Sequence, residues 1–384
     1  MKSNKKKVFY WAPCLNKVGT VISTKNSAIA LSKYKGNIFD VYIINVCGEW
    51  DEYLEEFKKN NIKIISLTFS YHSYLPKNGF IASRFSYILI FLLSLFPLLF
   101  CIKKHRADFF IMHLITSLPL FLISIFSFNT RFILRISGFP KLNFFRKLFW
   151  RRSNKKLFKI TCPTQELKSK IEKNYIFDKE KIIYLQDAII NLDQFSKNET
   201  LKININSNKK IILSAGRLTR QKNYLYLIKE YEKFLKTSED YDLIILGDGE
   251  DKNKLLELVK KIKLENRVHI IGRVNNVYDY MKMSNVFVLS SLWEELGFVI
   301  VEAAFNNLFL IASNCPNGPS EFLDENKCGI LFESNVENSL NNALIQYLNT
   351  EKKYEKRLNA KKKSSHYTKF QHHLTLEKIL KNEN

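Results

Sequence analysis

The chain has 384 residues, of which 46% are hydrophobic and 25% are charged. This composition excludes a chain that is disordered throughout, and the length predicts two to three domains that each bury a core. The formal net charge of +23 indicates attraction to polyanions such as nucleic acid, anionic lipid or phosphorylated substrates, or else a biased composition with many solvated lysines.

Six cysteines are spread along the chain without any C-x-x-C pair. This pattern argues against structural zinc and a disulfide framework, and it predicts isolated buried thiols in a reducing compartment. The lysine-rich start precedes only a short apolar run that breaks at Asn16 and Lys17, which is unlike a signal peptide. We therefore expect the protein in the cytoplasm.

Short apolar runs mark the strands of an N-terminal Rossmann-like sheet. The predicted strands are Val8–Trp11, Val41–Val46, Ile62–Leu67, Asp108–Met112 and Phe132–Ile136, with a helix from about Thr24 to Tyr34. Gly19 follows the first strand, where a glycine serves a plain turn or lets the backbone approach a ligand closely. His113 follows the fourth strand, where it is either a structural or a functional histidine.

The stretch Phe85–Ile102 contains no charged residue and is flanked by basic side chains. As a helix it would be about 27 Å long, at the lower limit for crossing a bilayer. Pro97 would kink such a helix, and the strand that follows directly is needed by the sheet. We favour a helix that packs on the domain or touches a membrane, with a true transmembrane span as the alternative.

Residues 141–159 combine eight basic side chains and five aromatic ones with no acidic residue. Basic residues interleaved with aromatics are typical of a helix in an anionic membrane interface. A merely solvated helix is the second interpretation. A nucleic-acid face is the third, and we expect no nucleic-acid partner.

Three strand-and-helix repeats predict a second parallel α/β sheet in the C-terminal half. The strands are Ile211–Ser214, Leu243–Leu246 and Val286–Leu289. The loops at their C-terminal ends should gather on one edge as a binding crevice. Arg217 and Lys222 would bring positive charge there, Glu294 and Glu302 would accept hydrogen bonds from sugar hydroxyls, and the amides of Gly297–Phe298 would face an anion at a helix start. This chemistry suits a nucleotide sugar.

The same residues resemble the retaining glycosyltransferases of family 4, whose GT-B fold has two Rossmann-like domains with parallel sheets facing across a cleft. The resemblance covers most of residues 8 to 350. It rests on Gly216-Arg217 with Lys222, Leu246-Gly247-Asp248-Gly249, Val268-His269-Ile270-Ile271-Gly272-Arg273, and Glu294 with Glu302 as a Glu-x7-Glu pair.

The resemblance implies a role for each matching residue. Arg217 and Lys222 would contact the diphosphate, Glu294 the donor-sugar hydroxyls and Glu302 the ribose. The base would stack in the loop after Gly272. The residues expected to act in catalysis are Glu294, Arg217, Lys222 and His113, and those expected to bind the donor are Glu302, Gly216, Gly19, Gly297, Phe298, Arg273, Val274 and Gly318.

Three departures from the family pattern concern the sugar. Relatives often carry two glycines where this chain has only Gly19, and a glycine where it has Glu295. Many also carry a histidine near Ser137, which is absent here, so that Arg135, Ser137 and the Gly138 backbone become candidates to support the transferring sugar. The segment around Gly318 resembles one that lies near the donor phosphates, with a bare turn as the alternative.

The sequence therefore predicts a retaining hexosyl- or N-acetylhexosaminyltransferase. It would use a nucleoside-diphosphate sugar, no metal and no other cofactor, and a lipid-linked or cell-surface glycan as acceptor, at the inner face of the cell membrane. The alternatives are a GT-B nucleotide-sugar epimerase and a non-catalytic basic protein that binds membranes or nucleic acid. The predicted boundaries are 1–195 and 210–365 for the domains, 196–209 for a linker, and 366–384 for a helix that returns to the first domain.

Overall fold

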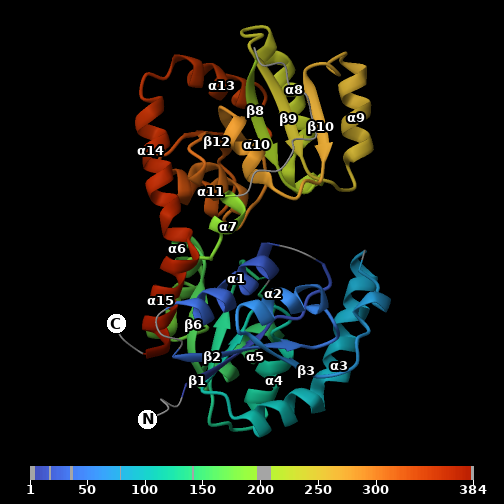
Figure 1. The fold of residues 1–384 in the computed structure, drawn as a ribbon, viewed down its shortest axis with the longest axis vertical. Coiled ribbons are helices and arrows are strands. Elements are labelled where there is room, and N and C mark those ends of the chain that lie inside the picture. Colours follow the sequence, from blue (N-terminus) through green and yellow to red (C-terminus); the bar gives the residue numbers. More distant parts are fainter. Residues whose placement is uncertain are drawn as a thin grey trace. The chain divides into compact units, whose positions relative to one another are not determined.

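The computed structural model describes residues 5–16, 19–34, 38–77, 79–140, 142–196 and 209–381. Its internal contacts divide the chain into two units (Figure 1). The N-terminal unit comprises Met1–Ala188 and Lys369–Asn384, and the C-terminal unit comprises Ile189–Thr368. The predicted boundaries stood at 195 and 366, and most of the predicted linker 196–209 lies outside the described residues.

The N-terminal unit is built on a seven-stranded parallel sheet in the order β3-β2-β1-β4-β5-β6-β7. Its strands are β1 (Lys6–Trp11), β2 (Phe39–Asn45), β3 (Lys63–Ser66), β4 (Phe109–Met112), β5 (Arg131–Arg135), β6 (Leu157–Cys162) and β7 (Ile182–Tyr184). Its helices are α1 (Gly19–Lys33), α2 (Leu54–Lys59), α3 (Phe80–His105), α4 (Ser117–Ile125), α5 (Phe144–Asn154), α6 (Gln165–Glu172) and α15 (Lys369–Lys381).

Both faces of this sheet are covered by helices, because successive side chains of a strand point to opposite faces. In β1, Val8 and Tyr10 pack in a core with α1, α2 and α15. Phe9 and Trp11 pack in a second core with α3, α4, α5 and α6. The near-continuous apolar strands are therefore those of a sheet buried on both sides.

The C-terminal unit has a six-stranded parallel sheet in the order β10-β9-β8-β11-β12-β13. Its strands are β8 (Lys210–Ala215), β9 (Tyr241–Leu246), β10 (Val268–Gly272), β11 (Val286–Leu289), β12 (Phe309–Ser313) and β13 (Ile330–Phe332). Its helices are α7 (Leu192–Phe195), α8 (Tyr224–Leu235), α9 (Lys252–Lys261), α10 (Val277–Met283), α11 (Phe298–Phe305), α12 (Gly318–Leu323), α13 (Ser339–Asn349) and α14 (Lys353–Ser364).

The strands of this second sheet also alternate between two cores. In β8, Leu213 and Ala215 contact the core that includes α10, α11 and α14, whereas Ile212 contacts the core with α8, α9 and α13. Helix α8 buries Leu227, Tyr231 and other side chains at helical spacing along one face, which holds it on the sheet. Each unit is thus a Rossmann-like layer of helices, parallel sheet and helices, as predicted.

The structure corrects two sequence expectations. The basic and aromatic stretch 141–159 is not a single helix, because α5 ends at Asn154 and Leu157 already pairs with Phe132 of β5. Its first residue, Lys141, lies outside the described residues. The first helix begins at Gly19 rather than near Thr24, so Gly19 belongs to a helix start and not to the middle of a loop.

Candidate active site

The C-terminal ends of β8 and β11 bring together several of the predicted residues. Lys222 lies in a short helical turn (Arg220–Lys222) after β8, and Glu294 lies in the loop after β11. The Lys222 ammonium forms an ion pair with the Glu294 carboxylate. The Ser291 hydroxyl donates to the same carboxylate at 2.6 Å. A cation and an acceptor thus stand side by side at one edge of the sheet.

Backbone and side-chain hydrogen bonds hold the two loops together around this pair. Leu292 N–H donates to the Gln221 carbonyl at 2.8 Å, and the Ser290 hydroxyl donates to the Lys222 carbonyl at 2.7 Å. The Gln221 amide donates to the Trp293 carbonyl at 2.8 Å. The position of the ion pair is therefore set by the main chain of both loops.

Two predicted glycines make room for this arrangement. A Cβ on Gly216 would stand 3.0 Å from Lys222 Cε and 3.0 Å from the Tyr224 hydroxyl, so its absence lets the lysine side chain pass. Gly297 has φ +77° directly before α11, a conformation that disfavours other residues. The amides of Phe298 and Val299 at the start of α11 have no preceding helical carbonyl to donate to, whereas the Ile300 N–H donates to the Gly297 carbonyl at 2.9 Å.

Gly318 packs against the backbone of the loop that carries Glu294. Its N–H donates to the Glu295 carbonyl at 2.6 Å, and an added Cβ would stand 2.1 Å from Leu296 Cα. The Asn317 side chain donates to the Glu294 carbonyl at 3.2 Å. This segment therefore supports the loop that carries Glu294, and a direct donor contact by Gly318 stays a prediction.

Glu302 lies on α11, one turn from the helix start, as the sequence predicted. The residue is half-buried, and its carboxyl group hydrogen-bonds the hydroxyl of Tyr278, which is buried on α10. Burial raises the pKa of Glu302 to about 8, against the lowering effect of that hydrogen bond. Tyr278 was not predicted, because nothing in the sequence links α10 to α11.

The remaining predicted donor residues lie at neighbouring strand ends. Arg217 is exposed in the loop after β8. Arg273 is exposed after β10, and Val274 beside it is partly buried against the core. Ser290 and Ser291 were missed, although their position directly after a predicted strand was the available signal.

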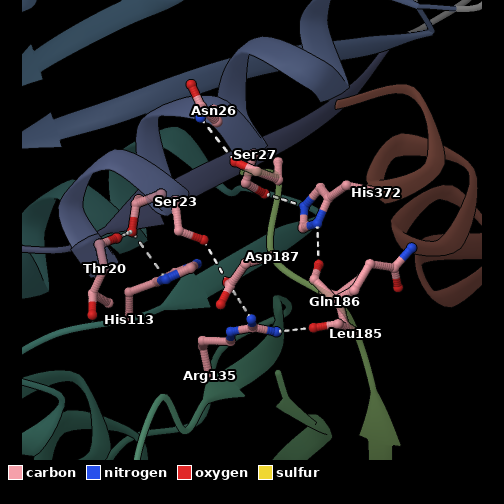
Figure 2. A network of polar contacts seen from close by, with 12 residues as sticks. Thr20, Ser23, Asn26, Ser27, His113, Arg135, Leu185, Gln186, Asp187 and His372 are labelled. Atoms are coloured by element: carbon pink, nitrogen blue, oxygen red, sulfur yellow. Dashed lines mark hydrogen bonds and ion pairs between the residues drawn. The ribbon is translucent and has the colours of Figure 1, made fainter. Parts of the chain in front are cut away.

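His113 and Gly19 belong to the N-terminal unit. His113 is buried after β4, and its Nδ1 lies 3.0 Å from the Thr24 hydroxyl (Figure 2). Because that hydroxyl donates to the Thr20 carbonyl at 2.8 Å, it accepts from Nδ1–H, which leaves Nε2 as an acceptor. Burial and the nearby Arg135 hold the pKa of His113 well below its usual value, so the ring is neutral.

A cavity of about 740 Å³ opens beside His113 within the N-terminal unit. Its lining includes Ser137 and Gly138 after β5, Tyr87 of α3 and Arg146 of α5. Arg135 also lines it, but its guanidinium donates to the Leu185 carbonyl at 2.6 Å and pairs with the buried Asp187. Among the described residues, the Nε of Arg135 has no hydrogen-bond partner.

Figure 2 shows how this part of the unit is tied to the end of the chain. Asp187 accepts from the Ser23 hydroxyl at 2.5 Å as well as from Arg135. His372 of α15 contacts the Ser27 hydroxyl at 2.7 Å and donates to the Gln186 carbonyl at 2.6 Å. Within the described ranges no group of three His, Cys, Asp or Glu side chains could hold a metal ion.

Comparison with known proteins shows sequence similarity to glycosyltransferases over part of the chain. Residues 196–364 match the family model of glycosyl transferases group 1. An uncharacterized glycosyltransferase of Methanocaldococcus jannaschii is 35% identical over 247 residues, which cover 59% of this chain and 61% of that protein.

The name of a second relative states a lipid-linked substrate. It is the N-acetylgalactosamine-N,N'-diacetylbacillosaminyl-diphospho-undecaprenol 4-alpha-N-acetylgalactosaminyltransferase of Campylobacter jejuni, 30% identical over 235 residues that cover 59% of this chain and 63% of the relative. The matched region thus spans about three fifths of the length of both relatives, 61% and 63%.

A solved structure extends the likeness to the whole fold. The crystal structure of a glycosyltransferase from Rickettsia africae has a TM-score of 0.78, with 21% identity, and each chain is covered to 99%. Residues 196–364 therefore match glycosyl transferases group 1, and the chain has the GT-B fold of solved glycosyltransferases.

Proposed function

We propose that this protein is a retaining glycosyltransferase that moves a hexosyl or N-acetylhexosaminyl group from a nucleoside-diphosphate sugar to a lipid-linked glycan. The observation that carries the proposal is the Lys222–Glu294 pair between the glycine-containing loops after β8 and β11. The ammonium matches an anionic diphosphate, and the carboxylate matches the hydroxyls of the attached sugar.

The chemistry needs stabilisation of a leaving group more than it needs a base. The bond between sugar C1 and the diphosphate oxygen breaks, and the electron pair stays on the diphosphate. The acceptor oxygen forms its bond to C1 on the same face, and its proton passes to a leaving phosphate oxygen. Lys222, Arg217 and the first amides of α11 would stabilise the developing charge. This route asks for no metal and no separate general base.

The position and protonation state of His113 support a role for this side chain in holding a sugar. Its neutral ring presents Nε2 as an acceptor and lines the cavity of the N-terminal unit. A hydroxyl of the transferring or accepting sugar could donate to that nitrogen. Protonation would remove the acceptor, and the lowered pKa prevents it at neutral pH.

The acceptor is inferred from the same cavity and from a relative. The cavity is lined by Arg135 and Arg146, together with aromatic side chains such as Trp150. The guanidinium group of Arg146 suits a phosphate, and the Campylobacter relative is named for a diphospho-undecaprenol substrate. We therefore propose a diphosphate-linked lipid carrier of a glycan, at the inner face of the cell membrane.

The test is transfer from labelled nucleotide sugars to a diphosphate-linked lipid glycan, measured for the wild type and for Glu294→Gln and Lys222→Met. Each substitution should lower kcat by at least about 100-fold, as for the loss of one charge-stabilising group. Both partners are largely buried, so folding of each variant is checked by circular dichroism.

Asp242→Asn is the matched control, because it also breaks a largely buried ion pair in the same sheet. Asp242 accepts from Arg267 at 2.7 Å, near the start of β9 and away from the proposed donor loops. This variant should lose stability but keep kcat near the wild-type value. Full activity in both Glu294→Gln and Lys222→Met would overturn the assignment. A product of inverted anomeric configuration would overturn its retaining part.

A further inference from the structure

Helix α3 (Phe80–His105) has one face packed into the protein and one face uncovered. Ser86, Ile90, Ser94 and Leu98 recur every four residues and are fully buried. The uncovered face carries large apolar side chains that are each at least 59% exposed: Ile81, Phe85, Ile88, Leu92, Phe96 and Phe100. Their spacing of three and four residues places them along one stripe of the helix. Exposed apolar stripes of this size mark an interaction surface.

The packed face argues against a transmembrane span. By length and composition α3 could cross a membrane, but 33% of its most apolar window is buried in the protein. Ile90 and Leu98 belong to the same core as the sheet. A crossing by α3 would carry the open edges of that sheet into the hydrocarbon, where unpaired backbone groups cannot be satisfied. The helix can therefore enter a bilayer only along its exposed stripe.

The surroundings of the stripe are basic. Neither α3, α4 nor α5 contains an acidic residue. Lys103 and Lys104 are exposed at the end of α3, and Arg151 and Arg152 are exposed on α5. Helix α5 also exposes Phe144 and Leu148. Apolar and cationic side chains together match a leaflet that contains anionic lipids.

The three helices pack side by side in the N-terminal unit. The rings of Phe91 on α3 and Phe121 on α4 lie 5.8 Å apart, and α4 contacts α5. Figure 1 shows α3 on the outside of this unit with α4 next to it. The cavity beside His113 is lined by Tyr87 of α3 and by Arg146 of α5, so it reaches this same surface.

We propose that α3 and α5 dock the protein onto an anionic leaflet, with α3 lying parallel to the membrane plane and its exposed stripe inserted at the acyl boundary. The phosphates of the leaflet would meet the cations of α5 and of the α3 terminus. On the proposed function, a lipid-linked acceptor would enter the cavity between Tyr87 and Arg146 without leaving the bilayer. The membrane contact itself does not depend on that function.

Insertion is tested with Phe96→Trp in the full chain and vesicles of phosphatidylcholine with phosphatidylglycerol. Relative to the wild type with its four native tryptophans, the added indole emission should shift to the blue and be quenched by brominated acyl chains. Leu256→Trp is the matched control, because Leu256 is 46% exposed on α9 of the other unit. Its added emission relative to the wild type should show neither effect. An unquenched Trp at position 96 would overturn the proposal.

The charge contribution is tested by flotation with the same vesicles. Replacing Arg151 and Arg152 by Gln should weaken binding about fivefold per charge, and added salt should act in the same direction. The control replaces the exposed pair Lys260 and Lys261 of α9 by Gln and should bind like the wild type. Equal binding to vesicles without phosphatidylglycerol would overturn the proposal that anionic lipids contribute to docking.

Two other occupants of the stripe give distinct results. A protein that resists extraction by alkaline carbonate would be a transmembrane protein, contrary to the proposal. A dimer in lipid-free solution that Leu92→Asn with Phe96→Asn converts to a monomer would assign the stripe to a second copy. Transfer to a soluble acceptor analogue separates the two hypotheses: activity without vesicle binding would leave the proposed function standing and overturn the docking surface.

Discussion

The Lys222 ammonium and the Glu294 carboxylate form an ion pair although 72 residues separate them in the chain. Both side chains are largely buried, with relative exposures of 14% and 8%. The family resemblance assigned one residue to the diphosphate and the other to the sugar, and it did not imply that they contact each other. The pair thus contributes to the fold of the C-terminal unit as well as to the proposed site.

A double-mutant cycle should reveal this second contribution. Lys222→Met and Glu294→Gln each leave a buried group without its partner, so each should lower the free energy of unfolding by about 3 kcal/mol. The double variant should lose clearly less than the sum, because neither charge is then stranded. Urea unfolding measures the free energy of unfolding of the two single variants and of the double variant.

An exposed ion pair is the control for this cycle. Lys63 and Asp40 lie 3.0 Å apart with side-chain exposures of 54% and 29%. Breaking this ion pair should lower the free energy of unfolding by less than about 1 kcal/mol. Additive losses for Lys222→Met and Glu294→Gln would show that the pair has no coupling energy.

Local pattern was enough to locate most strands and several helices. The strand Val286–Leu289 was predicted with the observed bounds, and α15 lies within the predicted C-terminal helix 366–384. These elements are set by runs of apolar residues or by turn signals at their ends, which are properties of neighbouring residues. The order of strands in the two sheets was not predicted, because it depends on pairing between segments that are distant in the chain.

The sequence predictions failed where the local structure depends on contact with a residue that is distant in the chain. Phe158 and Lys159 were placed in a basic helix, but they belong to β6, whose formation depends on pairing with β5 and β7. Arg135 looked available to a sugar because its partner, Asp187, lies 52 residues away in the chain. The contact between Ser27 and His372 spans 345 residues and had no signal in the sequence.

Gly247→Ala should disturb the proposed donor loop through the main chain. Gly247 has φ +140°, and an added Cβ would stand 1.8 Å from the Gly216 carbonyl oxygen. Its own N–H donates to the Gly272 carbonyl at 2.8 Å, so the clash cannot be relieved without moving two strand ends. We expect a lower melting temperature and at least a tenfold weaker affinity for the bound nucleoside diphosphate, about 1.4 kcal/mol.

Gly79→Ala separates backbone strain from the clash. Gly79 also has a positive φ of +89°, but an added Cβ would meet nothing within 4 Å. Its replacement should cost only about 1 kcal/mol of stability and leave nucleotide affinity unchanged. If the two variants behaved alike, the close approach of Gly247 to Gly216 would have no effect on the site.

His372 should make the stability of the N-terminal unit depend on acidic pH. Burial lowers the pKa of His372 from 6.5 to about 4, and the neighbouring Arg135 acts in the same direction, whereas the Gln186 carbonyl and Asp187 oppose it. Between these values the unfolded chain binds more protons than the folded one. The free energy of unfolding should therefore fall as pH decreases from 6.5 to 4, by up to about 3 kcal/mol.

The measurement is urea unfolding of the wild type and of His372→Gln over this pH range. The variant lacks the titrating ring, so its stability should vary less with pH even though it is less stable at pH 7. Replacing the exposed His366 by Gln is the control and should leave the pH dependence unchanged. Parallel curves for the wild type and His372→Gln would contradict the role given to the buried ring.

Glu302 should produce the opposite dependence in the C-terminal unit. Burial raises its pKa from 4.5 to about 8, so between these values the folded protein holds a proton that the unfolded chain has lost. The contribution of this group to the free energy of unfolding should then decrease as pH rises from 4.5 to 8. Glu302→Gln removes the titration, and its stability relative to the wild type should grow over this range.

The same carboxyl group gives a test of the ribose contact. Ribose hydroxyls donate best to an ionised carboxylate, so a nucleoside diphosphate should bind more tightly as pH rises toward 8, by at most about tenfold per pH unit, and then reach a plateau. The ligand is chosen as the one among UDP, GDP and ADP that raises the melting temperature most. Calorimetry should show proton release on binding to the wild type and none to Glu302→Gln. Equal proton release from both proteins would exclude Glu302 from the contact and leave the role of Lys222 untouched.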